Sequence, residues 1–187
     1  MNTGFESPSL HFQPAVGMIA HHQEYYTIID SAALAACSGL LDLRLKNIQE
    51  IASQGATEIR LEMKKNDGEE GYETYKDFKL VDGTNYTLSM DKSSARRSAV
   101  KSISESENFG TGIGFPFSTY DRDMDLLENQ NLPLQRNGAW WYSSDTDVNL
   151  NGKYCEPGTN CRWLGHIHAG FAGGESLKSS RMLIRRV

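Results

Sequence analysis

Hydrophobic residues recur every three or four positions in the first part of the chain. Between Leu41 and Ser53, the residues Leu41, Leu45 and Ile48 fall on one side of a helical projection and charged residues fall on the other. This spacing predicts an amphipathic helix that ends near Gly55. The apolar run from Ile28 to Ser38 also predicts a helix.

The period changes to two after Gly55. Apolar and polar residues alternate over Thr57–Met63, Tyr72–Leu80 and Asn85–Met90, and turn sequences rich in Asn, Asp and Gly separate these runs. Short turns between alternating runs predict neighbouring antiparallel strands. A strand pattern also closes the chain over Arg181–Val187.

Regular patterns are weak in the rest of the chain. Ser93–Ile103 is basic and predicts a short helix, whereas 104–160 is dense in Gly, Asn, Asp, Ser and aromatic residues without a period. A loop-rich stretch this long is usually functional, or is organised by something other than strand pairing, such as a metal ion.

Composition excludes some classes of function. The 187 residues are 39% hydrophobic and carry a formal net charge of -5, so a broad nucleic-acid surface is not expected. No apolar run reaches the roughly 20 residues that cross a bilayer. The first residues lack the basic start of a signal peptide, so a secreted location does not follow from a targeting segment.

The three cysteines have different surroundings. Cys155 and Cys161 flank a turn-rich Glu-Pro-Gly-Thr-Asn loop, which brings a local disulfide within reach and leaves two free thiols as the alternative. Cys37 lies among alanines and leucines and fits a small buried residue.

The most concentrated chemistry is acidic. Asp121, Asp123 and Asp125 alternate within five residues, and such carboxylates repel unless water or a cation separates them. Oxygen ligands on a loop favour Ca²⁺, with a solvated acidic loop as the alternative. His166 and His168 would also allow a metal hydrolase, but no nucleophile or general base is marked, so no enzyme is expected.

Several ordered motifs follow one another in the second half of the chain. They are Phe117-Ser118-Thr119-Tyr120-Asp121-Arg122-Asp123-Met124-Asp125, then Gly138-Ala139-Trp140-Trp141-Tyr142, Asn149-Leu150-Asn151-Gly152-Lys153-Tyr154 and Met182-Leu183-Ile184-Arg185. On these motifs the chain resembles the fibrinogen-related domains of fibrinogen, ficolins, tachylectins, tenascins and angiopoietins. The resemblance covers 41–187 and leaves 1–40 unmatched, as in an N-terminally truncated or divergent member.

The resemblance implies a fold and a domain division. The fold is α+β, an antiparallel sheet with short helices over about 41–103 and a loop-rich calcium- and ligand-binding part over about 104–187. The family's central strand is missing upstream, and Glu24–Ile29 is the segment that would replace it.

The resemblance also implies site residues. Asp123 and Asp125 would bind Ca²⁺ through their side chains, the carbonyls of Leu127 and Asn129 would complete the protein ligands, and Asp121 would support them. At least one tryptophan of the Trp140-Trp141-Tyr142 cluster is expected in the core rather than in a binding site.

The ligand-binding region departs from the family. The family's acetyl-group pocket corresponds to Ser144, Asp145 and Thr146, but the disulfide beside it is replaced by Asn131 or Leu132 and by Asp145. We therefore expect a secreted, calcium-binding, lectin-like domain for carbohydrate or acetylated ligands, with innate immunity as one setting. The alternative is a matrix or receptor-ligand module that binds an extracellular protein.

Two further expectations complete this interpretation. Asn85-Tyr86-Thr87 is an N-glycosylation sequon, which suits a secreted protein. No membrane span and no nucleic-acid partner are expected, and an oligomer is compatible with the family although no heptad or collagen-like segment is visible.

Overall fold

The structure is a computed structural model that describes residues 26–30, 38–98, 103–143, 147–161 and 163–187, with side-chain detail from Arg44 onward. The elements in chain order are β1 (Tyr26–Asp30), α1 (Ser38–Ser53), β2 (Thr57–Lys64), β3 (Glu70–Val81), the 3₁₀ turn η1 (Gly83–Asn85), β4 (Thr87–Arg97), the 3₁₀ turn η2 (Phe109–Gly112), α2 (Leu132–Arg136), β5 (Val148–Asn149), β6 (Ile167–His168), α3 (Ala169–Ala172) and β7 (Ser179–Arg186).

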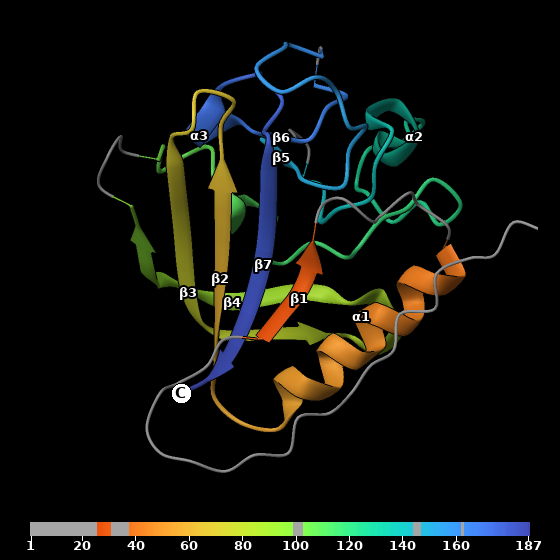
Figure 1. Cartoon of the computed structure of the whole chain (residues 1–187). Helices are drawn as coiled ribbons and strands as arrows, with labels where there is room; N and C mark the ends of the chain where they lie inside the picture. Colours follow the sequence, from red (N-terminus) through yellow and green to blue (C-terminus); the bar gives the residue numbers. More distant parts are fainter. Residues whose placement is uncertain (1–25, 31–37, 99–102, 144–146, 162) are drawn as a thin grey trace, which may run out of the picture.

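Five strands form one antiparallel sheet in the order β1-β7-β2-β3-β4 (Figure 1). The strands predicted from alternation therefore exist, and the predicted helix over 41–53 is confirmed as α1. The helix predicted over 28–38 is wrong at its start, because 28–30 belong to β1, which pairs with β7 instead. The replacement strand expected over Glu24–Ile29 is confirmed from Tyr26 onward, so β1 and β7 both join the sheet from outside 41–103.

The alternation of β2 decides which face of the sheet is buried. Ile59, Leu61 and Met63 are almost completely buried, whereas Arg60 and Glu62 between them are partly exposed. Successive strand residues point to opposite faces. One face therefore joins the hydrophobic core and the other carries charge.

The basic segment after Met90 is not a helix where the structure describes it. Ser93–Arg97 continues β4, which pairs with β3 on both sides of an irregular stretch. There Asp91 Oδ1 accepts from Ser93 N at 2.9 Å, and Ser94 Oγ accepts from Lys76 N at 2.8 Å. Pairing with β3 overrides the weak helical pattern, as tertiary context commonly does.

Helix α1 is held against β3. Leu45, Ile48 and Ala52 are buried at helical spacing, and Gln49 Nε2 donates to the carbonyls of Leu80 at 2.9 Å and Gly83 at 3.0 Å. Because the amide of Gln49 satisfies two carbonyls where β3 ends, it fixes the helix along its axis as well as its apolar face.

Aromatic side chains form a cluster in the core of the loop-rich part. Trp140 and Trp141 are each 2% exposed, and their rings lie 5.1 Å apart. Phe117 packs edge-on to Trp141 at 4.9 Å, and Trp141 Nε1 donates to Tyr86 O at 2.7 Å. The expectation that at least one tryptophan is a core residue is confirmed for both.

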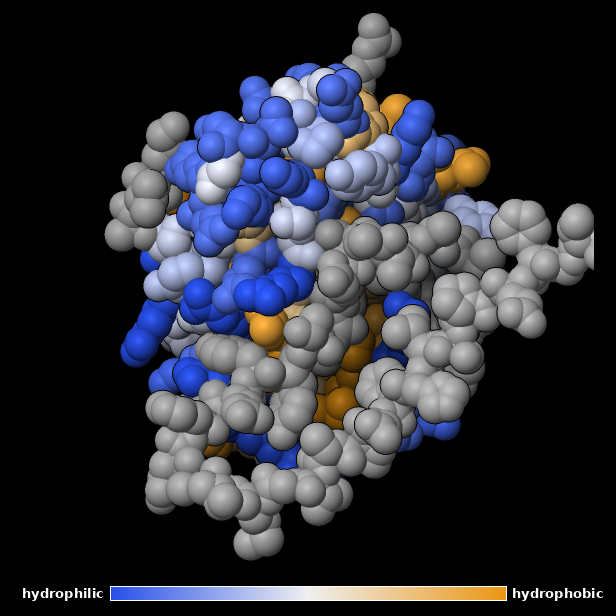
Figure 2. Space-filling model, in the orientation of Figure 1, coloured by the Kyte–Doolittle hydropathy of each residue, from blue (hydrophilic) through white to orange (hydrophobic). Residues whose placement is uncertain are grey.

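The described surface over β2, β3 and β7 is mainly hydrophilic in Figure 2. This agrees with the polar residues on the outer face of β2. Within the described ranges, no helix combines the length and the apolar character needed to cross a bilayer.

Candidate functional site

The acidic loop begins from a short backbone pairing. Ser118 exchanges two hydrogen bonds with Trp140, one from Ser118 N at 2.9 Å and one from Trp140 N at 3.2 Å. Thr119 and Arg122 close a tight turn by exchanging backbone hydrogen bonds of 3.0 and 3.1 Å. The loop is thus tied to the Trp-Trp-Tyr segment on one side, and its acidic residues follow directly.

Asp125 is the most strongly held carboxylate of the loop. Its Oδ1 accepts from Leu127 N at 2.9 Å, and its Oδ2 accepts from Leu132 N at 2.7 Å. The side chain therefore closes the loop between its middle and the start of α2. Each carboxylate oxygen has a second lone pair, so both still have acceptor capacity.

Asp123 is exposed and lies beside Asp125. Its Oδ1 accepts from Asp125 N at 3.3 Å. Partial desolvation, together with the neighbouring Asp125 carboxylate, raises the pKa of Asp123 above its ordinary value. Two carboxylates this close repel each other, and a bound cation would relieve that repulsion.

The other predicted ligands are close in the same loop. Leu127 O accepts from Gln130 N at 3.2 Å, and Asn129 has a left-handed backbone with φ of 65°. Asp121 points back to the turn, where its Oδ1 accepts from Thr119 Oγ1 at 2.8 Å. This geometry suits the predicted supporting role of Asp121 and leaves Asp123 and Asp125 as the two aspartates predicted to bind the ion.

These residues fit a calcium ion only as a mixed donor set. Among the described residues, no three His, Cys, Asp or Glu side chains gather in a way that could hold a metal. A site at Asp123 and Asp125 would therefore depend on backbone carbonyls as well as carboxylates, which Ca²⁺ accepts readily. The four predicted ligands stay a prediction.

Arg122 connects the acidic loop to the sheet. Its Nη1 donates to Thr84 O at 2.5 Å, and its Nη2 donates to Asn85 Oδ1 at 2.9 Å. Asn85 is the asparagine of the sequon, and its neighbour Thr87 is buried. Glycosylation of Asn85 stays a prediction.

The Asn-Leu-Asn-Gly motif has a structural role. Asn149 is fully buried, donates from Nδ2 to Arg136 O at 3.1 Å and accepts from the Tyr142 hydroxyl at 2.8 Å. Asn151 Nδ2 donates to Ala139 O at 3.0 Å. A Cβ on Gly152 would lie 2.3 Å from Gly165 O, so only glycine fits there. The motif therefore fastens loops together.

The structure decides between a disulfide and two free thiols at Cys155 and Cys161. Cys155 and Cys161 form a disulfide, with 6.6 Å between their Cα atoms. Asn131 is one of the positions where the family's other disulfide is absent. Its side chain caps α2 instead, by accepting from Leu134 N at 2.8 Å. The predicted ligand pocket, Ser144, Asp145 and Thr146, lies outside the described residues, as does Cys37.

Known proteins resemble this chain in sequence and in fold. The chain matches the family described as "Fibrinogen beta and gamma chains, C-terminal globular domain" over residues 38–187. The chain belongs to the fibrinogen C-terminal domain family. The resemblance inferred from the motifs is thus confirmed, and the match includes all of α1.

Two curated relatives are similar to this chain over most of its length. Human tenascin-R is 39% identical over 131 residues, which cover 66% of this chain and 9% of tenascin-R. Human ficolin-3 is 30% identical over 142 residues, which cover 75% of this chain and 45% of ficolin-3. The chain therefore spans only a small part of one relative and less than half of the other.

A solved structure supports the fold. The fibrinogen-like globe domain of human ANGPTL2 superposes with a TM-score of 0.66 at 29% identity, and the superposition covers 76% of this chain and 63% of that chain. Members of the fibrinogen C-terminal domain family are binding modules rather than enzymes.

A buried polar network escaped the sequence-based predictions. Glu73 is fully buried in this fibrinogen-like domain and lies 2.5 Å from His168 Nε2. Tyr75 donates its hydroxyl to Glu73, and Phe109 N donates at 3.4 Å. The position of Glu73 could have indicated this network, because a carboxylate that lies opposite Leu61 on the buried face of β3 needs hydrogen-bond partners.

The same network bears on the hydrolase hypothesis. His168 contacts Glu73, and His166 Nε2 lies 2.8 Å from Ser180 Oγ, with both imidazoles buried. These histidines are therefore engaged with the sheet rather than with the acidic loop. They contribute to packing between the two parts of the domain.

Proposed function

We propose that this chain is an extracellular, non-enzymatic recognition domain whose acidic loop binds Ca²⁺. The observation that carries the proposal is the arrangement of Asp125, whose two oxygens are oriented by Leu127 N and Leu132 N beside the Asp123 carboxylate. Asp123 and Asp125 would hold the ion with the carbonyls of Leu127 and Asn129.

The ion would supply positive charge and order to the loop. The loop is paired with Trp140 through Ser118, and that segment leads into Ser144, Asp145 and Thr146. A loop ordered before the ligand arrives lowers the entropy cost of binding. This connection is how calcium would support recognition at the predicted pocket.

The ligand class has two candidates. Similarity to ficolin-3 favours a lectin-like domain for carbohydrate or acetylated ligands, with innate immunity as one setting. Similarity to tenascin-R and to angiopoietin-like globe domains favours a module that binds an extracellular protein. The disulfide Cys155–Cys161 supports an oxidising, extracellular location for either.

Calcium binding is tested by thermal melting during a calcium titration. A hundredfold excess over Kd stabilises a protein by about 2.7 kcal/mol, which corresponds to a rise in Tm of roughly 5–10 °C. Asp123→Asn should abolish this rise, because it removes a ligand charge while disturbing only one weak hydrogen bond.

The matched control is Glu128→Gln. Glu128 is exposed in the same loop and outside the predicted ligand set, so this variant should keep the calcium-dependent rise. A wild-type melting curve that ignores calcium would contradict the proposal. Equal loss in both variants would mean that only the general charge of the loop matters.

The two ligand classes are separated by a glycan array run with calcium and with a chelator. Saturable binding to acetylated glycans that the chelator removes supports the lectin-like function. Absence of glycan binding by a protein that shows the calcium-dependent melting rise would favour the protein-interaction module.

A further inference from the structure

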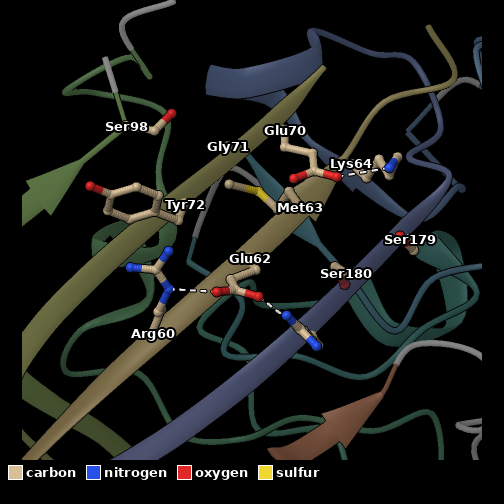
Figure 3. A pocket seen from close by; sticks show the side chains of 11 residues that line it. Arg60, Glu62, Met63, Lys64, Glu70, Gly71, Tyr72, Ser98, Ser179 and Ser180 are labelled. Carbon is tan, nitrogen blue, oxygen red and sulfur yellow. Dashed lines mark hydrogen bonds and ion pairs between the residues drawn. The ribbon is translucent and has the colours of Figure 1, made fainter. Parts of the chain in front are cut away.

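The outer face of the sheet carries a groove unrelated to the acidic loop. The groove has a volume of about 550 Å³ and lies across β3, β2 and β7 (Figure 3). By strand alternation, its walls are the side chains of Arg60, Glu62, Lys64, Tyr72 and Arg181. A volume of this size suits a small ligand of about one or two sugar rings.

One carboxylate organises the charges of this groove. Glu62 Oε1 accepts from Arg60 Nε at 2.6 Å, and Glu62 Oε2 accepts from Arg181 Nε at 2.6 Å. Burial acts to raise the pKa of Glu62, but the hydrogen bonds and charges of Arg60 and Arg181 more than offset it and lower the pKa. Glu62 therefore stays ionised and holds the two guanidinium groups on its opposite sides.

Both arginines keep most of their hydrogen-bonding capacity. Each donates its Nε to Glu62, and neither has a hydrogen bond from its Nη nitrogens to another described residue. A guanidinium has five N–H donors, so four remain on each side chain. These donors are already oriented, because Glu62 fixes both guanidinium groups and Tyr72 supports Arg60 at 3.8 Å from its ring centroid.

The local charge differs from that of the whole chain. The groove is lined by three cations, Arg60, Lys64 and Arg181, and by two carboxylates, Glu62 and Glu70, whereas the chain has a net charge of -5. Arg181 is 57% exposed and Lys64 is 40% exposed. A ligand with acidic groups would therefore meet its donors here without first breaking a buried ion pair.

From these observations we infer that the groove is a second binding site, which takes an acidic saccharide about the size of a disaccharide. Two guanidinium groups separated by one carboxylate match two acidic groups on a single ligand better than one isolated anion. The remaining acceptors on Glu62 and Glu70, with the hydroxyl of Ser179, suit sugar hydroxyl groups. The site does not depend on calcium in the acidic loop.

The experiment is a titration with a heparin-derived, sulfated uronic acid–glucosamine disaccharide in the presence of EDTA, followed by amide NMR shifts. We expect saturable binding, with the largest shifts in the outward residues of β2 and β7. Arg181→Gln should weaken binding by about tenfold, since it removes charge-assisted hydrogen bonds worth about 1.5 kcal/mol. The exposure of Arg181 makes a folding defect easy to exclude by melting.

The matched control is Arg186→Gln, which removes the same charge from the same strand. Arg186 bonds to Gln54, the residue that follows α1, and does not line the groove, so binding should persist. Equal weakening by both variants would overturn the site in favour of general charge attraction.

The unsulfated disaccharide distinguishes sulfate from carboxylate recognition. Weaker but saturable binding of this probe, still sensitive to Arg181→Gln, would assign part of the affinity to the uronate carboxylate and would support the site. No saturable binding of either probe would overturn the inference. Binding that requires calcium and is lost in Asp123→Asn would place the ligand at the acidic loop and would also overturn it.

Discussion

The sheet and the loop-rich part of the molecule hold their backbones in different ways. The strands β2, β3 and β7 pair residue by residue along continuous ladders. Between residues 104 and 178, the side chains of buried asparagines hydrogen-bond to backbone groups in place of a partner strand. Asn108 Nδ2, for example, donates to the carbonyls of Ser104 at 3.0 Å and Glu105 at 2.6 Å. A ladder tolerates many side chains, whereas a loop held by an amide requires that amide.

The largest expected loss of stability comes from removing the Glu73 side chain, which links the sheet to the loop-rich part. Its partner His168 belongs to β6, and Phe109 N comes from η2, so Glu73→Ala leaves buried polar groups of the loop-rich part without their acceptor. Removing one member of a buried charged network costs about 3–5 kcal/mol. Chemical denaturation measures the loss, and hydrogen exchange should show the loop-rich part opening before the sheet.

Glu70→Ala is the control for this variant. Glu70 lies on the same strand, is 70% exposed and pairs with Lys64, so its removal should change the free energy of unfolding by less than about 1 kcal/mol. Similar losses in the two variants would show that Glu73 does not join the two parts.

A smaller effect is expected on acidification. Burial lowers the pKa of His166 from 6.5 to about 4, so the unfolded state binds more protons between these values and stability falls as the pH falls. The full difference corresponds to about 3 kcal/mol. The pKa of Glu73 is also below its ordinary 4.5, because the His168 hydrogen bond and charge outweigh its burial, and its protonation adds to the loss at lower pH.

Unfolding midpoints measured in urea from pH 7 to pH 4 test this expectation. His166→Gln should flatten the decline between pH 6.5 and pH 4 even if the variant is less stable at pH 7. An unchanged slope in His166→Gln would assign the acid sensitivity to other groups.

The smallest of the three effects is expected for Asn149, whose side chain connects two loops. Asn149→Ala leaves the Tyr142 hydroxyl and the Arg136 carbonyl without their partner. We expect a loss of about 2 kcal/mol, measured by thermal melting. Asn47→Ala, on the exposed side of α1, is the control, and its stability should stay within about 0.5 kcal/mol of the parent. An equally small change in Asn149→Ala would show that this buried amide does not hold the loops together.

The same difference explains how much of the fold could be predicted. Alternation identified β2, β3 and β7, since one buried face leaves a period of two. It failed at 28–30 and at Ser93–Arg97, where the strand exists because a partner strand lies beside it. In the loop-rich part no period exists, and only the motifs around Trp140 and Asn149 indicated the fold.

The candidate sites also differ in whether they could be predicted from the sequence. The alternating aspartates at 121, 123 and 125 could be recognised from the sequence because they lie within five residues of one another. The Glu73–His168 pair joins residues 95 positions apart, and the groove needs β7 to lie beside β2. Neither can be predicted until the strand order is known.

The position of β7 sets the order in which the domain can assemble. Its eight residues lie between β1 and β2, and Arg181 reaches a partner 119 positions earlier in the chain. Closing a contact over such a span slows folding. During synthesis β1 and β2 emerge long before the strand that separates them, so their hydrogen-bonding edges stay open to other chains until β7 arrives. A chaperone that covers these two edges would therefore raise the yield of folded protein more than one that acts on the loops.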